Sequence, residues 1–198
     1  RVCKAIEAEP KASHALTIRR NFVAVLSDGS AVLGLGNIGA RAAMPVMEGK
    51  ALLFKYLGGV DAVPLMLDTK DPDAIIDMVL ALQPSFGGIN LEDIKAPEAF
   101  EIERRLKEEL DIPVMHDDQH GTAIISAAAL LNALELAGKK MESVRIVISG
   151  AGAAAVSCTR LYKAFVARPE NIVMLDSKGD IRSDRESLSA EKREFATD

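Results

Sequence analysis

Short apolar runs alternate with amphipathic segments along the first 120 residues. The runs are rich in β-branched and apolar residues and are bounded by Gly, Pro or Asp, which is typical of buried strands. They occupy residues 21–30, 62–67, 85–93 and 112–116. Between them, apolar residues recur at helical spacing and predict helices. These helices run from near Pro45 to Gly58-Gly59, over 71–82 with Asp71 as N-cap, and over 97–110.

The alternation continues after a long apolar helix predicted over residues 121–140. Gly138 is expected to end this helix, because glycine readily adopts the left-handed conformation at a helix C-terminus. A strand is predicted at 144–149, then a helix, then a second strand at 171–175. Residues 180–198 are strongly polar, so we expect a solvated surface segment or a frayed end there.

Strands alternating with helices of about 10–15 residues are typical of α/β proteins with a largely parallel sheet. We predict an α/β fold in which a parallel-sheet catalytic domain, residues 1–121, precedes the first part of a Rossmann-type dinucleotide-binding domain, residues 122–198. A complete Rossmann domain has two βαβαβ halves, and about the first βαβ is recognisable here. The chain also begins with Arg1 rather than Met. We therefore expect the natural protein to be longer than this chain.

Composition narrows the classes of function. The chain is 48% hydrophobic, which is enough for a sizeable core, and its net charge of −5 argues against a nucleic-acid-binding surface or a basic membrane-facing patch. No uninterrupted apolar run reaches about 18 residues, so we expect no transmembrane helix. Cys3 and Cys158 lie too far apart in the sequence for a disulfide framework, which fits a reducing, cytoplasmic setting.

A glycine pattern follows the strand predicted at 144–149. Its residues are Gly150, Ala151, Gly152, Ala153, Ala154 and Ala155. This is the dinucleotide-binding pattern G-x-G-x-x-G/A, in which the first glycine permits the tight turn and the second lets the backbone approach a pyrophosphate. The third small residue lets helix and strand pack closely. The helix N-terminus then favours the phosphate charge.

Asp176 ends the next strand, 24 residues after Gly152, near the position of the acid that binds the ribose hydroxyls. An acid here favours NAD because it repels a 2′-phosphate, although Ser177 and Lys178 weaken that preference. NADP therefore remains an alternative. The whole motif could also be a Gly/Ala-rich turn that binds nothing.

Two acidic pairs lie at the ends of predicted strands: Glu92-Asp93 ends the strand 85–93, and Asp117-Asp118 comes directly after the strand 112–116. Functional groups collect at the carboxyl ends of strands in open α/β sheets, so the pairs are expected to converge. Gathered carboxylates repel one another unless a cation lies among them. Their hard oxygen atoms suit Mg²⁺ or Mn²⁺, with Glu92, Asp93 and Asp118 as ligands. Each pair could instead be a solvated loop edge or a helix cap.

The neighbouring basic residues have weaker signals. His116 and His120 could bind a metal, but we interpret them as groups that support the site. Lys50 and Lys55 lie on a predicted helix after Glu48 and Gly49, where a partly desolvated lysine could act as a general base. From the residues alone, a solvated helix lysine is the simpler reading for both.

Five segments, in this order, closely resemble bacterial-type malic enzymes. They are SDGSAVLGLGNIG, PVMEGKALLFK, INLEDI, HDDQHGTA and GAGAAA, and the resemblance runs from about residue 20 to 178. It implies that malate is oxidised by NAD or NADP with Mg²⁺ or Mn²⁺ and then decarboxylated to pyruvate and CO₂. It also implies Lys50 as general base, Asp117 as the acid supporting it, and Glu92, Asp93 and Asp118 as metal ligands.

The sequence departs from the family pattern at the catalytic tyrosine, which lies in a YTPGV-like segment. Neither Tyr56 nor Tyr162 matches that segment, and the later asparagines that bind substrate in the family are not matched either. A chain this short is expected to be weakly active or inactive by itself.

Three rival interpretations remain open at this stage. The protein could be a metal-free dehydrogenase of another hydroxy or amino acid, or a non-catalytic nucleotide-binding member of the fold. It could also be an interface segment of a larger oligomer. α/β dehydrogenases often pair helices across two-fold axes, and the apolar segment 121–137 fits this, so we expect a homodimer or a higher homo-oligomer.

Overall fold

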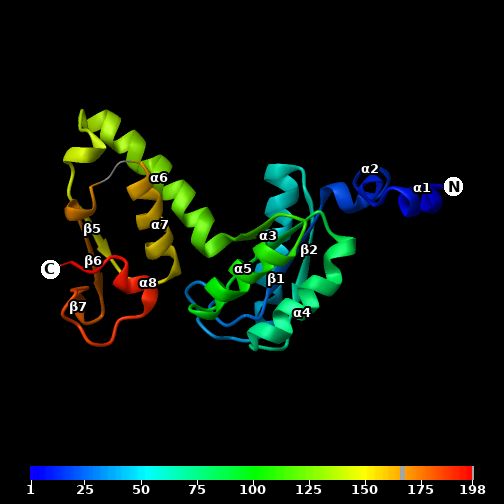
Figure 1. The fold of residues 1–198 in the computed structure, drawn as a ribbon, viewed down its shortest axis with the longest axis horizontal. Helices are drawn as coiled ribbons and strands as arrows, with labels where there is room; N and C mark the ends of the chain where they lie inside the picture. The colour runs from blue at the N-terminus through cyan, green and yellow to red at the C-terminus, as the bar shows by residue number, and fades with distance from the viewer. Residues whose placement is uncertain (166–167, 198) are drawn as a thin grey trace. The chain divides into compact units, whose positions relative to one another are not determined.

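The computed structural model describes residues 1–165 and 168–197. The chain divides into two compact units, Arg1–His116 and Asp117–Asp198. Each unit contains its own sheet, in the order β2-β1-β3-β4 in the first and β5-β6-β7 in the second (Figure 1). The α/β architecture predicted from the alternation of strands and helices is therefore confirmed.

The first sheet consists of parallel strands. They are β1 (Phe22–Ser27), β2 (Asp61–Met66), β3 (Gly88–Leu91) and β4 (Val114–His116). The chain passes from β1 outward to β2 and then back across β1 to β3 and β4. Crossovers between parallel strands are right-handed, so this reversal places the helix between β1 and β2 on one face of the sheet and the two later helices on the other. The carboxyl ends of β1, β3 and β4 come together where the reversal occurs.

Helix α3 (Ala40–Gly58) packs on β1 and β2, whereas α4 (Pro72–Leu82) and α5 (Glu98–Glu109) pack against each other. As predicted, the Asp71 side chain caps α4 by accepting a hydrogen bond from the backbone N–H of Asp73. The predicted start of α3 at Pro45 is wrong, because the helix begins five residues earlier. Pro45 lies within its second turn, where the missing N–H removes one backbone hydrogen bond.

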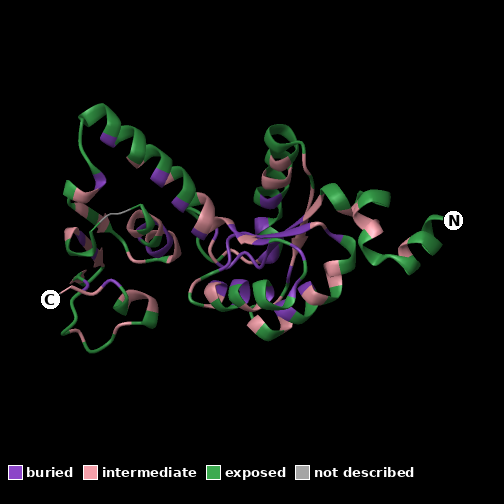
Figure 2. Ribbon diagram, turned by 45° about the horizontal axis from the view of Figure 1, so that its top comes forward, coloured by how far each residue is buried: buried purple, intermediate pink, exposed green. Residues whose placement is uncertain are grey.

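The core of the first unit lies between its sheet and the helices α4 and α5. Its fully buried side chains include Leu26, Ile75, Leu91 and Ile102. Figure 2 shows buried positions concentrated along the strands and on the inner sides of the helices. The segment before β1 is mostly exposed and forms short helices. They are α1 (Val2–Ala8), η1 (Pro10–Ala12), α2 (Ser13–Leu16) and η2 (Ile18–Asn21). Short 3-10 helix η3 (Gln83–Ser85) follows α4.

The second unit begins with α6 (Asp117–Ala137), which packs against α7 (Ala153–Ala164). Helix α6 starts four residues earlier than predicted and includes both aspartates. Gly138 follows it with a φ of 61°, the left-handed conformation that was expected of the glycine ending this helix. Among the described residues, α6 alone is long and apolar enough to cross a membrane by length and composition. Polar residues interrupt its apolar run, so the helix did not meet the criterion of an uninterrupted apolar run that was applied to the sequence.

The strands of the second unit are β5 (Ile146–Ser149), β6 (Ile172–Asp176) and β7 (Gly179–Asp180). β5 and β6 are parallel, and β7 returns antiparallel to β6. The 3-10 helices η4 (Met141–Ser143) and η5 (Pro169–Asn171) precede β5 and β6. This β5-α7-β6 unit is the first part of the predicted Rossmann-type fold.

Most described residues after residue 180 are exposed, as expected of a solvated surface segment, but the segment is not a frayed end. Ile181 and Phe195 are buried with Val156 and Met174 in a small core, and α8 (Ala190–Arg193) lies between them in the sequence. The apolar side chains that anchor the segment are few and widely spaced, so a composition dominated by charge concealed them.

Candidate metal and nucleotide sites

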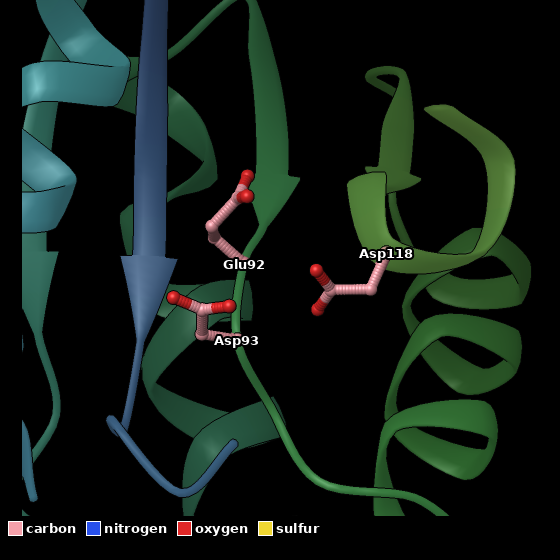
Figure 3. Close-up of side chains that lie close together, drawn as sticks. All are labelled: Glu92, Asp93 and Asp118. Atoms are coloured by element: carbon pink, nitrogen blue, oxygen red, sulfur yellow. The ribbon is translucent and has the colours of Figure 1, made fainter. Parts of the chain in front are cut away.

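Three carboxylates meet at the carboxyl ends of β3 and β4. Glu92 and Asp93 directly follow β3, and Asp118 lies two residues beyond β4. Leu91 and His116 are partners in the register of these two strands, so the residues that follow them emerge side by side. One carboxylate oxygen from each acid lies within 4.8 Å of the others (Figure 3). The convergence expected from strand order is therefore present.

The backbone at Asp93 is held in an unusual conformation. Its φ is 53°, the left-handed region that asparagine and aspartate tolerate better than other non-glycine residues. The carbonyl of Asp93 accepts a hydrogen bond of 2.9 Å from the N–H of Ala31, and Ser30 Oγ accepts one of 2.9 Å from the N–H of Lys95. The loop after β1 thereby fixes the turn that carries the buried carboxylate.

Glu92 is bound by two side chains of the first unit. Lys50 Nζ lies 3.1 Å from Glu92 Oε2, and Asn90 Nδ2 donates a hydrogen bond of 2.9 Å to the same oxygen. Lys50 comes from α3, and its side chain is only 22% exposed. From the residues alone, a solvated helix lysine was the simpler reading for Lys50. In the structure, its side chain is instead largely buried beside the acids. It supplies one positive charge to the cluster.

The two aspartates lie in the first turn of α6, where the helix dipole favours negative charge. The Asp117 carboxylate lies over Gly121, so close that a methyl group on Gly121 would overlap Asp117 Oδ1. His116, just before them, is fully buried, and its backbone N–H donates to Glu103 Oε1 at 3.1 Å. Glu103 also pairs with Lys107 at 2.7 Å.

This donor set fits a hard divalent cation. Three carboxylates from two strand ends would repel one another at these separations without a compensating charge, and Lys50 balances one of them. Mg²⁺ and Mn²⁺ prefer oxygen ligands and are commonly held by a few carboxylates, with water or substrate oxygens completing the shell. The alternative of separate solvated loop edges does not describe this arrangement, because Glu92 and Asp93 are largely buried.

The glycine motif forms the turn between β5 and α7. Gly150 has φ 118°, a conformation that L side chains rarely adopt, and its N–H donates to the carbonyl of Leu175 at 2.9 Å. Gly152 is the N-cap of α7, and a Cβ there would meet nothing within 4 Å. The backbone at the helix N-terminus is therefore open to a ligand. Ala151 and Ala155 pack on the small core, while Ala153 and Ala154 form the first turn of α7.

Asp176 lies at the end of β6, as predicted, but it is ion-paired. Arg185 Nη1 and Nη2 donate to its two oxygens at 3.1 and 3.0 Å, and Lys192 Nζ lies 2.9 Å from Oδ2. The backbone N–H of Lys178 donates to Oδ1 at 2.9 Å. The hydrogen bonds from Arg185 above all, then those from Lys192 and Lys178, hold the pKa of Asp176 well below its usual range. The preference for NAD over NADP was argued from an Asp176 carboxylate that has no cations beside it. The ion pairs with Arg185 and Lys192 weaken that argument.

Several residues that the sequence singled out have structural surroundings of their own. Tyr56 is 81% exposed on α3, and Tyr162 donates a hydrogen bond of 3.0 Å to Ser126 Oγ, which links α7 to α6. Lys55 pairs with Asp61 at 2.6 Å on the surface. His120 lies in the first turn of α6. Asn90, Glu103, Arg185 and Lys192 were missed, although a polar residue inside an apolar strand was a usable signal for Asn90.

A parallel sheet with gathered acids, joined in sequence to a strand–glycine turn–helix unit, defines an α/β protein of the dinucleotide-binding class. The family description "Malic enzyme, N-terminal domain" matches residues 5–107, and "Malic enzyme, NAD binding domain" matches residues 119–198. The chain belongs to the malic enzyme family.

Relatives and solved structures agree with this assignment. The chain is 57% identical over 196 residues to the NAD-dependent malic enzyme of Geobacillus stearothermophilus and 56% identical over 193 residues to the NADP-dependent malic enzyme of Halomonas elongata. These alignments cover 99% and 98% of this chain but 41% and 46% of the relatives, so the chain spans less than half of their length.

Crystal structures from two organisms match nearly the whole chain. The NAD-dependent malic enzyme of Thermotoga maritima superposes with a TM-score of 0.94 at 46% identity, covering 99% of this chain and 53% of that one. The Entamoeba histolytica malic enzyme superposes with a TM-score of 0.96 at 44% identity, covering 99% and 43%. The fold and the family are thus supported at high sequence identity.

Proposed function

We propose that the protein containing this chain catalyses the oxidative decarboxylation of malate to pyruvate and CO₂, with a nicotinamide cofactor and Mg²⁺ or Mn²⁺. The observation that carries the proposal is the convergence of Glu92, Asp93 and Asp118 beside the half-buried Lys50. Membership of the malic enzyme family and the names of the relatives support the substrate and the cofactor class.

Glu92, Asp93 and Asp118 would hold the divalent metal. When bound, it supplies a Lewis acid that polarises the carbonyl formed by oxidation and so favours loss of CO₂. The αL turn at Asp93 and the hydrogen bonds to Glu92 keep two of these carboxylates in place before metal or substrate arrives. Such preorganisation avoids the free-energy cost of ordering the side chains during the reaction.

Lys50 would act as the general base that accepts the proton of the malate hydroxyl. Only a neutral amine can accept a proton, so Lys50 would have to release one before it acts as a base. In line with the family resemblance, we assign Asp117 the role of orienting Lys50 and balancing its charge. We assign protonation of C3 to no residue of this chain, since neither tyrosine matches the family's motif.

The turn from Gly150 to Ala155 would bind the cofactor pyrophosphate at the N-terminus of α7. The open backbone at Gly152 supports this role. Either NAD or NADP fits the names of the relatives. We further propose that the protein is cytoplasmic and forms a homodimer or a higher homo-oligomer. The exposed apolar residues Leu52 and Leu57 on α3, and Ile124 and Ile125 on α6, support self-association.

The test is malate-dependent formation of reduced nicotinamide by the complete polypeptide, followed by absorbance with added Mn²⁺ and with a chelator. Lys50→Ala should lower kcat by about 10²–10⁴-fold, the usual contribution of a general base, while cofactor binding stays near normal. The matched control is Lys55→Ala on the same helix, which should leave turnover unchanged.

Asp118→Asn should raise the Mn²⁺ concentration needed for half-maximal activity and lower kcat, because one negatively charged ligand is lost. Asp77→Asn, an exposed acid on α4, is the control. Turnover that persists with Lys50→Ala, or that ignores the chelator, would contradict the proposal. Cofactor binding without any malate-dependent reduction would instead favour a non-catalytic member of the family.

A further inference from the structure

We propose that Asn90 is a positioning residue of the metal site, which holds Glu92 in the orientation that binds the cation. This inference rests on the proposed function, because it assumes that Glu92 is a metal ligand. Asn90 itself touches neither the reacting atoms nor the other two acids in any contact that the structure describes. Its role would be exerted through the Glu92 carboxylate.

Asn90 occupies an unusual place for a polar residue. It lies inside β3, between Ile89 and Leu91, and is only 3% exposed. Its partners in the neighbouring strands are Val25 and Met115, both apolar. A buried amide that lacks a hydrogen-bond partner costs about 1–3 kcal/mol. A strand of this kind would be more stable with an apolar residue here unless the amide has a specific partner.

The alternation of side chains along β3 supplies that partner. Successive residues of a strand point to opposite faces, and Ile89 and Leu91 belong to the core under α4 and α5. Asn90 and the residue two positions later, Glu92, therefore face the opposite side, where Lys50 of α3 reaches Glu92. The Asn90 amide donates 2.9 Å to Glu92 Oε2. The strand thus carries the acid and its support on one face.

The amide supports Glu92 in a way that Lys50 cannot. Lys50 contacts the same oxygen at 3.1 Å, but in the proposed reaction it changes its protonation state and serves the substrate. Asn90 carries no charge and cannot titrate, so its hydrogen bond persists throughout the reaction and adds no repulsion toward a cation. Hydrogen bonds from such supporting residues fix ligand orientation, and their removal typically costs about 10–100-fold in metal affinity.

The experiment is a titration of the complete polypeptide with Mn²⁺, in which free Mn²⁺ is followed by electron paramagnetic resonance. Asn90→Leu keeps nearly the same size but cannot donate, and should raise the Kd for Mn²⁺ by about 10–100-fold. Asn90→Gln keeps the amide and should lose less affinity than Asn90→Leu. The control is Thr159→Val, which removes a similarly buried hydrogen bond, to the carbonyl of Ala155, far along the sequence in α7. It should leave the Kd unchanged.

A second readout separates positioning from a purely structural role. At saturating Mn²⁺, Asn90→Leu should recover a kcat within a few-fold of the unchanged protein, while its half-saturating Mn²⁺ concentration stays raised. If Asn90→Leu does not fold, Asn90→Thr replaces it, since threonine favours strands and is too short to reach Glu92. The same rise in Kd is then expected.

The outcomes distinguish this inference from the proposed function. If the unchanged protein binds Mn²⁺, Asp118→Asn weakens that binding, and the Asn90 variants bind within twofold of the unchanged protein, the role of Asn90 is wrong and the proposed function stands. If the unchanged protein does not bind Mn²⁺ at all, both are overturned.

Discussion

Asp93 illustrates how one residue can meet a backbone and a chemical requirement together. Among the described residues it is the only non-glycine residue with a positive φ, 53°. Glycine would adopt this conformation at less cost, but it would offer no oxygen to a cation. Aspartate tolerates the left-handed region and supplies the carboxylate, so it meets both requirements at this position. The sequence suggested the ligand but contained no sign of the turn.

Gly121 is the residue at which the proposed role of Asp117 can be tested without altering Asp117 itself. A methyl group at Gly121 would overlap Asp117 Oδ1, so Gly121→Ala must displace that carboxylate. The displaced group is the end of a flexible side chain, and alanine favours the helix over glycine by about 1 kcal/mol. We expect little change in Tm but a fall in kcat of more than about tenfold. A tenfold loss of rate corresponds to the free energy of one modest hydrogen bond.

The control for this prediction is Gly58→Ala, near the end of α3, where a Cβ would make only an ordinary contact of 3.7 Å with Val60. Its kcat should be unchanged. An unchanged kcat in Gly121→Ala as well, with a crystal structure showing the carboxylate displaced, would contradict the role of Asp117.

At the scale of elements, the hairpin of β6 and β7 is tied to the segment that follows it by Asp176. Arg185 and Lys192 both come from that segment, and their hydrogen bonds lower the pKa of Asp176 in the folded protein. A carboxyl whose pKa is lowered by folding stabilises the folded state above its ordinary pKa of about 4. That contribution disappears as the pH falls from there toward the folded-state pKa.

We therefore expect Asp176→Asn to lower the Tm of the protein at pH 7, because two cations lose their common partner. The difference in Tm from the unchanged protein should shrink progressively below about pH 4. Thermal unfolding followed by circular dichroism between pH 3 and pH 7 checks this, with measurements at high salt for comparison.

Asp184→Asn is the matched control, since Asp184 pairs with Arg182 at 3.3 Å but its side chain is 70% exposed. Exposed pairs contribute little to stability, so its Tm should be close to that of the unchanged protein at every pH. A Tm difference for Asp176→Asn that does not depend on pH would contradict the ion-pair explanation.

The sequence predicted elements best where local signals agreed. Asp71 and Pro72 marked the start of α4 because capping and proline geometry act within a few residues. The start of α3 was predicted wrongly from Pro45. Packing on β1 and β2 stabilises the helix on both sides of this proline despite the lost hydrogen bond. The helix predicted from residue 121 left out the acidic residues at the start of α6, although acids are favourable in the first turn of a helix.

At the scale of the whole molecule, each unit has a hydrophobic core of its own. The core of the first unit joins its sheet to α4 and α5, and two smaller clusters lie within the second unit. A cavity in one of these cores should therefore weaken that unit more than the other. Ile102, fully buried in α5, is a suitable site.

We expect Ile102→Ala to destabilise the first unit by about 2–5 kcal/mol, the usual cost of this truncation in a packed core. Hydrogen–deuterium exchange should show faster exchange of amides in β3 and β4, whereas amides in β5 and β6 keep most of their protection. Ile18→Ala, on an exposed position of η2, is the control and should leave both units unchanged. Equal acceleration in both sheets would show that the cores unfold together.

The candidate site was predictable as far as strand order determines it. Because the carboxyl ends of neighbouring parallel strands meet, the sequence alone predicts that Glu92, Asp93 and Asp118 lie together. The partners of these acids could not, because they depend on side-chain direction and on contacts between distant segments. Lys50 reaches Glu92 from another layer, and Arg185 reaches Asp176 from a segment whose composition predicted no structure.

Helix α6 presents apolar side chains outward, including Ile124, Ile125 and Leu136, the last of which is 90% exposed. Figure 2 shows most of this helix as exposed. A preparation of these 198 residues alone would be retained on hydrophobic-interaction resin and would precipitate at a low concentration of ammonium sulfate. Sulfate salts have this effect because they strengthen association between apolar surfaces. Purification in low salt with a mild detergent is the practical course.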